Sequence, residues 1–133
     1  MIDKTLSLTI LPDKLAVYHL DKNAGLPQWV NKKHLFFWSI TKTTDELSVT
    51  SPEALVPLGI EAVKGWKAIK IEGPLDLAKT GILTSIINPL AKEKISTFVI
   101  STFETDYILI KEDKLDKAVE VLGKLYLIQN SSL

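Results

Sequence analysis

The sequence predicts an α+β protein of two ferredoxin-like units, of which the first is abbreviated. In the second half, strand and helix patterns follow one another in the order β-α-β-β-α-β, which is the order of the ferredoxin-like fold. The first half is rich in strand patterns and has only short helical segments. Residues 41–49 and 102–110 both carry T-x-x-T-D followed by alternate apolar positions, which indicates an internal repeat. We therefore expect one unit over residues 1–62 and another over residues 63–133.

Strand patterns dominate the first half. Apolar and polar residues alternate over residues 6–10, as in a strand with one buried face. Residues 15–20 form a more continuous apolar run, which is typical of a more fully buried strand. Residues 35–41 and 46–50 predict a hairpin around a polar turn.

Two short helical segments are expected between these strands. Gly25 to Pro27 opens a candidate that ends near Val30. Ser51 could cap a second short helix, with Pro52 in its first turn. Proline is tolerated there because the first backbone N–H groups of a helix have no partner within it.

The second half begins with a strand over residues 66–72, which Gly73 and Pro74 end. A helix follows, with one apolar stripe. The stripe consists of Ile82, Leu83, Ile86, Ile87 and Leu90. Pro89 falls late in this helix and is expected to kink or shorten it, because proline cannot donate a backbone hydrogen bond.

The remaining elements are two strands, a helix and a last short strand. The strands are expected over residues 95–101 and 106–110. Asp113 is expected to cap the final helix and Gly123 to end it. A short strand near residues 126–128 would follow, and the tail is expected to be frayed.

Composition excludes several classes of partner and site. Sixteen lysines balance sixteen carboxylates and no arginine is present, which disfavours nucleic acid as a partner and a bidentate arginine clamp. There is no cysteine, so disulfides and thiolate sites are ruled out. No apolar run approaches the roughly 20 residues that cross a bilayer, and the N-terminal residues lack the pattern of a signal peptide. We therefore expect a cytoplasmic protein that does not bind a membrane.

The most informative stretch is residues 81–111, which reads as a helix, a strand, a tight turn and a strand. Its turn, S-T-F-E-T-D, carries hydroxyls, one aromatic ring and a carboxylate between two β-branched runs. No catalytic group is prominent nearby. The pattern favours a small-molecule binding module over an enzyme.

The chain resembles the tandem ACT-domain family that includes the CASTOR-type arginine sensors. The resemblance rests on GPLDLAKTGILTSIINPLAKEKISTFVISTFETDYILIKEDKL (residues 73–115), with further support from TTDELSV and SPEALVP in the first half. It is specific from Trp66 to Leu122. The resemblance implies two ACT units, a regulatory amino-acid-binding role without catalysis, and pairing of two chains through their sheets.

The resemblance also implies a ligand site between ACT units. One side would be the loop before the helix together with the S-T-F turn, and the other would be a strand of the partner. The implied residues are Asp76, Lys79, Thr80 and Gly81 in the loop, Thr102, Phe103 and Asp106 in the turn, and Ser96 and Thr97 in the facing strand. In arginine-sensing members, the resemblance implies an acidic pocket with a carboxylate at the position where this chain has Lys79. A lysine beside Asp106 disfavours arginine, so an uncharged or acidic amino acid is an equal candidate.

Each of these residues also has a local explanation. Thr102, Thr105 and Asp106 can satisfy backbone groups of the turn without any ligand. Gly81 can serve only as a helix start. Asp76 and Lys79 can be a solvated pair, and Ser96 and Thr97 ordinary strand residues. For these residues, the sequence favours a role in ligand binding and a role in local structure about equally.

Other chemistry has weaker support. Glu104 and Asp106 are two residues apart, as a carboxylate pair of a hydrolase could be, but no substrate cleft is predicted. His19 and His34 lack further ligands at metal-binding spacing, so we expect no metal site and no cofactor. The leading hypothesis is a non-catalytic sensor that binds an amino acid between ACT units of a homodimer. The alternative is a dimerisation scaffold with a vestigial pocket.

Overall fold

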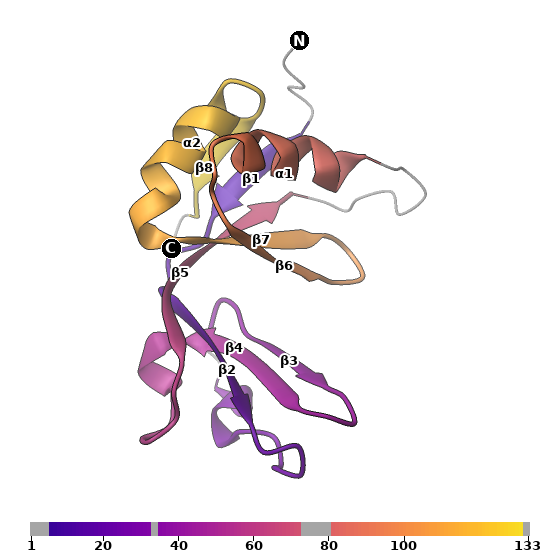
Figure 1. Ribbon diagram of the computed structural model, residues 1–133, viewed down its shortest axis with the longest axis vertical. Helices are drawn as coiled ribbons and strands as arrows, with labels where there is room; N and C mark the ends of the chain where they lie inside the picture. The colour runs from indigo at the N-terminus through magenta and orange to yellow at the C-terminus, as the bar shows by residue number, and fades with distance from the viewer. Residues whose placement is uncertain (1–5, 33–34, 73–80, 132–133) are drawn as a thin grey trace. The chain divides into compact units, whose positions relative to one another are not determined.

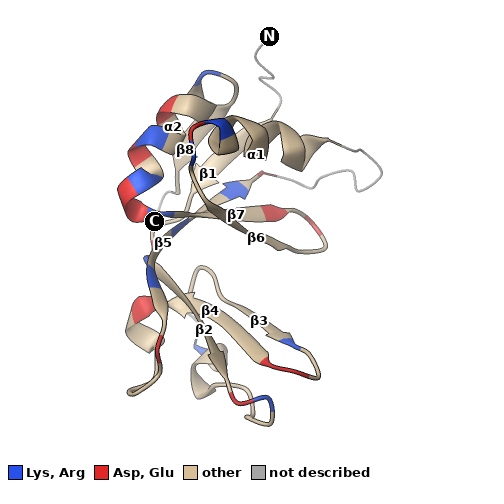
Figure 2. Cartoon of the chain, in the orientation of Figure 1, with Lys and Arg blue, Asp and Glu red and all other residues tan. Residues whose placement is uncertain are grey.

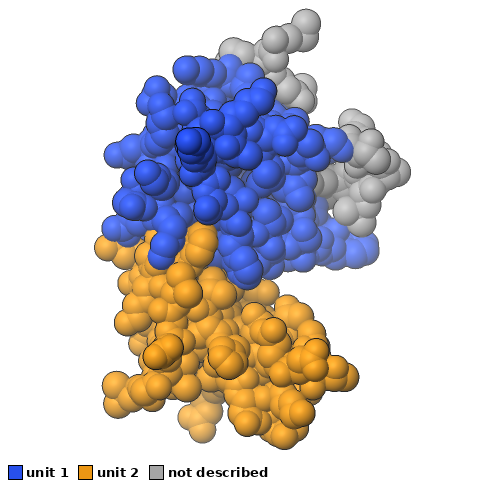
Figure 3. All heavy atoms as spheres, viewed as in Figure 1, with its two compact units in different colours: residues 1–12, 67–133 blue, residues 13–66 orange. Residues whose placement is uncertain are grey.

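The computed structural model describes residues 6–32, 35–72 and 81–131 (Figure 1). The chain divides into two compact units, which Figure 3 shows in different colours. Unit 1 comprises residues 1–12 and 67–133, and unit 2 comprises residues 13–66.

Unit 1 contains a five-stranded sheet with two α-helices. Its elements are β1 (Ser7–Ile10), the second part of β5 (Val63–Ile71), α1 (Ile82–Lys92), β6 (Thr97–Ser101), β7 (Asp106–Lys111), the 3-10 helix η3 (Glu112–Lys114), α2 (Leu115–Gly123) and β8 (Leu127–Asn130). The strand order is β8-β1-β5-β7-β6. From β5 onward the elements follow the predicted β-α-β-β-α-β order, so the α+β, ferredoxin-like class is confirmed.

The first strand of the chain lies inside this sheet. β1 pairs antiparallel with β5, where Leu8 is opposite Ile71, and parallel with β8, where Leu8 is opposite Ile128. β1 thus separates two strands that would be neighbours in a simple ferredoxin-like sheet. The compact units therefore differ from the expected division after residue 62, because the pairing of β1 joins the N-terminus to the second half.

One face of the sheet in unit 1 packs against α1 and α2. Its fully buried side chains include Leu8, Ile69, Ile71, Ile86, Leu90, Ile108, Ile110 and Leu122. The apolar stripe predicted for α1 supplies Ile86 and Leu90 to this core. Burial of one such aliphatic side chain contributes about 1.5–3 kcal/mol, so this cluster is the main stabilising feature of the unit.

Unit 2 is an abbreviated copy of the same topology. Its elements are β2 (Leu15–Leu20), the 3-10 helix η1 (Gln28–Asn31), β3 (Ser39–Lys42), β4 (Leu47–Pro52), the 3-10 helix η2 (Glu53–Leu55) and the first part of β5. The antiparallel strand order is β3-β4-β2-β5. When the four strands are numbered in chain order, their order in the sheet is 2-3-1-4. The four strands β5 to β8 of unit 1 have the same order, β6-β7-β5-β8, apart from the inserted β1. The 3-10 turns of unit 2 take the places of the two helices of unit 1. The prediction that the first unit is abbreviated is confirmed.

The core of unit 2 lies on one face of its sheet. Ala16, Tyr18 and Val49 are buried there together with Trp29 of η1. The ring of Trp29 meets that of Trp38 edge to face, with centroids 5.8 Å apart. The short 3-10 turns thus supply the apolar cover that α-helices supply in unit 1.

A β-bulge interrupts β5 near the point where it passes from one unit to the other. Leu15 is opposite Trp66 but Val17 is opposite Val63, so two steps along β2 match three along β5. Gly65 adopts φ +82° within this bulge, a conformation that glycine accepts without steric cost. Its backbone N–H donates to the Glu53 carboxylate at 2.6 Å.

The repeat is present, but in a different register from the one the motif suggests. Lys42 is opposite Leu47 in the first hairpin and Ser101 is opposite Asp106 in the second. The equivalent four-residue turns are therefore 43–46 and 102–105. The shared T-x-x-T-D letters align residue 41 with residue 102, whereas the backbone aligns residue 43 with residue 102. A slip of two residues keeps every side chain on the same face, which is why the apolar alternation did not expose it.

Two predicted helix caps were wrong. Ser51 lies in β4, and its hydroxyl is 2.8 Å from the Tyr18 hydroxyl instead of capping η2. Asp113 lies inside η3, so the residue preceding α2 is Lys114 and no side chain caps the helix.

Of the two effects expected of Pro89, shortening does not occur, because α1 continues past it to Lys92. The end of the chain is not frayed up to Asn130, since β8 pairs with β1 along residues 127–130.

Candidate functional site

Gly81 precedes α1 and adopts φ +89°, a left-handed conformation. Its carbonyl accepts the first helical hydrogen bond, from the N–H of Ser85 at 2.9 Å. The backbone N–H groups of the first helical turn therefore have no partner within the helix. A Cβ at Gly81 would meet no described atom within 4 Å, so space is open on that side. This end of α1 has the properties that favour an anionic group.

The β6–β7 turn lies at the same end of unit 1 as the start of α1 (Figure 1). Thr102 closes the turn, because its N–H donates to the carbonyl of Thr105 at 2.8 Å and its hydroxyl donates to the same oxygen at 3.0 Å. Thr105 is buried, and its hydroxyl donates to the carbonyl of Ile71 at 2.5 Å. The turn is thereby attached to the end of β5. The sequence indicated Thr105 only as a turn residue, and its long-range bond was not foreseen.

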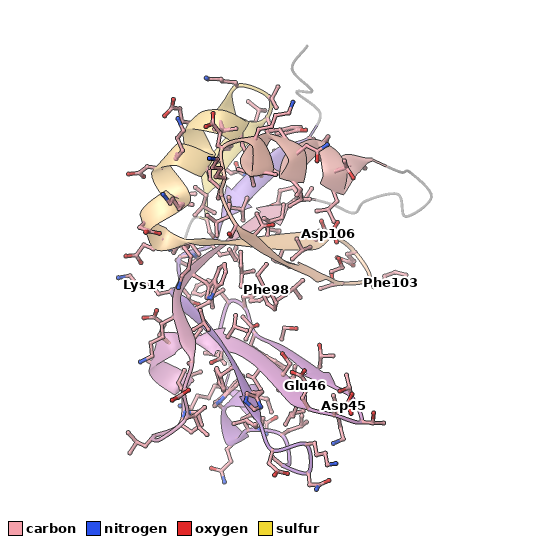
Figure 4. The ribbon with its side chains drawn as sticks, viewed as in Figure 1. Lys14, Asp45, Glu46, Phe98, Phe103 and Asp106 are labelled. Carbon is pink, nitrogen blue, oxygen red and sulfur yellow. The ribbon has the colours of Figure 1, made fainter. Side chains whose placement is uncertain are left out.

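Asp106 begins β7 on the face that the helices cover. Its side chain shares that face with Ile108 and Ile110, which are buried against α1 and α2. Figure 4 shows Asp106 on the α1 side of the hairpin. The carboxylate is half-buried, and within the described ranges no hydrogen bond or ion pair joins it to another side chain. It is available to accept from a ligand.

Phe103 projects from the tip of the hairpin and is 86% exposed (Figure 4). Its implied role in the ligand site stays a prediction, and its exposed ring is open to a ligand or to a second copy of the chain. Glu104 beside it is also exposed.

Ser96 and Thr97 lie at the other end of the hairpin. Thr97 is opposite Ile110, whereas Ser101 is opposite Asp106. At roughly 3.3 Å per residue, Thr97 is about 13 Å along the strand from Ser101. A single chain therefore does not bring these two residues to Asp106. Three other candidates, Asp76, Lys79 and Thr80, lie outside the described residues.

Neither a metal-binding cluster nor a membrane-spanning helix occurs in the part of the chain that the structure describes. No group of three or more His, Asp or Glu side chains there could hold a metal ion. Nor does that part contain a helix long and apolar enough to cross a membrane.

Two hollows lie in unit 2, whereas the described candidate residues all lie in unit 1. The first has a volume of about 650 Å³ and is bordered by His19, Ser48 and the carboxylates of Asp45, Glu46 and Glu61. The second, of about 600 Å³, is bordered by Lys22, Asn23, Lys42, Thr43 and Thr44. Neither set stands out in the sequence. The only signal was the polar turn at residues 42–45, which was interpreted as a hairpin connection.

Two family profiles match adjoining parts of the chain. The profile described as an ACT domain matches residues 61–124, and one described as an N-terminal domain matches residues 13–58. A solved structure of a protein from Agrobacterium tumefaciens is 30% identical and superimposes with a TM-score of 0.85, over 96% of this chain and 95% of that one.

The chain belongs to the tandem ACT-domain family.

Curated relatives of this ACT-domain chain include mammalian amino-acid sensors. The human protein named cytosolic arginine sensor for mTORC1 subunit 1 is 41% identical over 60 residues, which is 44% of this chain but only 18% of the sensor. The human protein named putative protein CASTOR3P is 28% identical over 113 residues, covering 74% of this chain and 68% of that protein. The chain thus spans a small part of the arginine sensors it matches.

The same fold occurs in a regulated enzyme. Aspartate kinase from Clostridium acetobutylicum, described as an allosteric enzyme, superimposes with a TM-score of 0.64 over 93% of this chain and 36% of the kinase. At 12% identity this likeness shows the fold and nothing more.

Proposed function

We propose that this ACT-domain protein is a non-catalytic regulatory module that binds a small amino acid or related metabolite. The ligand would lie at the end of unit 1 that carries Gly81 and the β6–β7 turn. The observation that supports this most directly is the pair formed by the start of α1 and the half-buried Asp106, whose carboxylate no described side chain engages, at one end of the unit.

The two groups suit the two charges of a free amino acid. The N–H groups at the start of α1 that have no partner within the helix, together with the helix dipole, favour the α-carboxylate. Asp106 can accept hydrogen bonds from the ammonium group. Thr102 contributes less, since its hydroxyl already serves the turn. Of the implied residues, Gly81 and Asp106 thus have the strongest support.

The side-chain preference of the site stays open between two classes. The mammalian relatives named as arginine sensors favour arginine. Lys79 stands at the position where arginine-sensing members are expected to have a carboxylate, and it favours an uncharged or acidic amino acid. The screen described below decides between them.

A second copy of the chain would complete the site. β6 pairs only with β7 among the described strands, and its sequence, TFVIS, has no charged residue or proline to block its open edge. Antiparallel pairing of two such edges about a two-fold axis would place the Ser96–Thr97 end of one β6 beside the Ser101 end of the other. Ser96 and Thr97 would then face the partner's Asp106 site, although they are remote from it within one chain.

Binding would act on this pairing. A ligand that contacts both copies binds the dimer better than the monomer, and so shifts the equilibrium or the affinity for another protein. We expect the module to work in the cytoplasm, as the relatives named cytosolic sensors do. In the alternative function, the β6-paired dimer is a scaffold and the pocket is vestigial.

A thermal-melt screen of the purified chain against the twenty amino acids tests the proposal. A ligand at 100 times its Kd should stabilise the chain by about 2.7 kcal/mol, which raises Tm by several degrees. Asp106→Asn keeps the shape and removes the charge, so it should abolish the shift. Asp116→Asn, an exposed aspartate on α2, is the matched control and should leave it intact.

A flat screen with an intact dimer would favour the scaffold. A monomeric mass by light scattering would contradict the shared site. Substitution of Gly81 is less informative, because any side chain at φ +89° strains the backbone whatever it does to the ligand.

A further inference from the structure

The hollow of about 650 Å³ in unit 2 is bordered mainly by residues on the face of the sheet opposite the core of that unit, and Tyr18 and Ala62 of the core side also border it. Val17 pairs with Val63 and His19 with Ser48, so these four side chains project from the same face. Tyr18 and Val49 project from the other face, into the core that η1 and η2 cover. The hollow therefore has a floor made by the strands themselves.

The floor is partly apolar and partly polar. Val17, Ala62 and Val63 supply hydrocarbon, and Val63 is 55% exposed. His19 and Ser48 supply polar atoms next to it. The volume lies within the range of about 300–1,000 Å³ that is usual for small-ligand pockets. An elongated ligand with an aliphatic stem and a polar head fits such a lining.

Every formal charge on the border of this hollow is negative. Asp45 and Glu46 come from the β3–β4 turn and Glu61 from the segment before β5. Among the described residues, no ion pair engages any of the three. Figure 4 shows Asp45 and Glu46 adjacent at the turn.

The lysines of this region belong to the neighbouring hollow. Lys42 and Lys22 border the second hollow, and the Lys42 ammonium donates to the Lys22 carbonyl. Figure 2 shows the positive end of β3, at Lys42, and the negative residues of the turn that follows it on one hairpin. The turn thus separates charges of opposite sign, although the whole chain is neutral.

The carboxylates are too dispersed for a metal ion, since no group of three acidic or histidine side chains in the described residues could ligate one. Dispersed carboxylates suit an extended cation, in which several N–H donors or two charged ends are spread along the molecule. We propose that this hollow binds an aliphatic amine or alkylguanidinium that has no carboxylate, with its stem over Val17 and Val63 and its cationic head toward Asp45, Glu46 and Glu61. This site is independent of the amino-acid site proposed in unit 1.

Agmatine is a suitable probe, because it has a guanidinium, an aliphatic stem and an amine but no carboxylate. Titration into the isotope-labelled chain should shift the amide resonances of residues 17–19, 45–48 and 61–63. Glu61→Gln and Glu46→Gln should each weaken binding about fivefold, since each removes one nearby charge at a solvated site. N-butylurea, which is similar in shape but uncharged, should not bind.

Glu104→Gln is the matched control, because Glu104 occupies in the β6–β7 turn the position that Asp45 occupies in the β3–β4 turn. It should leave agmatine binding unchanged. The proposal is overturned if these unit 2 resonances do not move up to about 10 mM agmatine. It is equally overturned if Glu61→Gln binds as well as the unsubstituted chain, or if Glu104→Gln and Asp106→Asn are the variants that weaken binding.

Discussion

The hydroxyl oxygen of Tyr126 lies 3.2 Å from the carbonyl oxygen of Ser85. Ser85 is four residues before Pro89, so its carbonyl is the one that the proline leaves without a helical donor. Tyr126, buried at the end of the loop after α2, supplies the missing hydrogen bond and also contacts the Ser85 hydroxyl at 2.8 Å. A residue far along the chain thus allows α1 to continue through a proline.

Tyr126→Phe should therefore lower the free energy of unfolding by about 1–2 kcal/mol, as expected for a buried hydrogen bond whose acceptor loses its donor. In a Pro89→Ala background the backbone N–H of residue 89 can serve Ser85, so the same substitution should cost less. Urea unfolding of the four chains in this double-mutant cycle measures the difference. Equal costs in both backgrounds would contradict the link between Tyr126 and Pro89, and Ser85→Ala separates the hydroxyl contact from the carbonyl contact.

Lys94→Gly should stabilise the chain by about 1 kcal/mol, because Lys94 has φ +59° and only glycine adopts this conformation freely. The helix end requires it: the N–H of Lys94 donates to Ala91 at 2.9 Å and that of Ile95 donates to Leu90 at 3.0 Å. The control is Lys92→Gly, within the last turn of α1, which should destabilise by about the same amount. Thermal melts compare the two, and a lower Tm for Lys94→Gly would be inconsistent with this helix end.

Thr105→Val should cost about 1–3 kcal/mol, because it leaves the Ile71 carbonyl without its donor in a buried position. Thr44→Val, in the exposed part of the other hairpin turn, should change stability by less than about 0.5 kcal/mol. Chemical denaturation tests both. If ligand binding in unit 1 depends on a turn held against β5, the first variant should also weaken it. A Thr105→Val chain as stable as the parent would argue against this attachment.

Burial raises the pKa of Tyr18 above its ordinary value of 10.0, and the hydrogen bond between its hydroxyl and that of Ser51 opposes this only in part. A raised folded pKa means that the neutral phenol contributes stability in full below about pH 10, and that this contribution is lost as pH rises from there through the folded pKa. Unfolding free energies measured on both sides of this window should fall more steeply for the parent than for Tyr18→Phe. The comparison cancels the titration of lysines, which is common to both chains, and parallel curves would contradict the burial effect.

Much of the fold could be predicted from local pattern. Alternation placed β1 and the apolar stripe placed α1, because a strand or helix with one buried face must repeat at its own period. The hairpins were found for the same reason. The bounds of β5 were less accurate: the strand starts at Val63, three residues before the predicted start, since the bulge at Gly65 breaks the alternation there.

The candidate site was predictable only in part. A glycine before an apolar stripe marks a helix start, and a polar cluster between β-branched runs marks a turn, so Gly81 and Asp106 could be named. The bond from Thr105 to Ile71 spans 34 residues and leaves no local signal. The acidic hollow of unit 2 was missed for the same reason, since Glu61 and Asp45 meet one border only after β2, β4 and β5 pair.

The sequence by itself determined which segments are strands and helices, that the second half follows the ferredoxin-like order, and that the chain repeats. These are properties of neighbouring residues, and they follow from side-chain periodicity and backbone preferences. Only the tertiary structure decided that β1 lies between β5 and β8, that the repeat is offset by two residues, and that α1 passes through Pro89. The first and the third depend on hydrogen bonds between residues far apart in the sequence. The second depends on which residues of each hairpin are opposite each other, a choice that the alternation of apolar residues leaves open in steps of two.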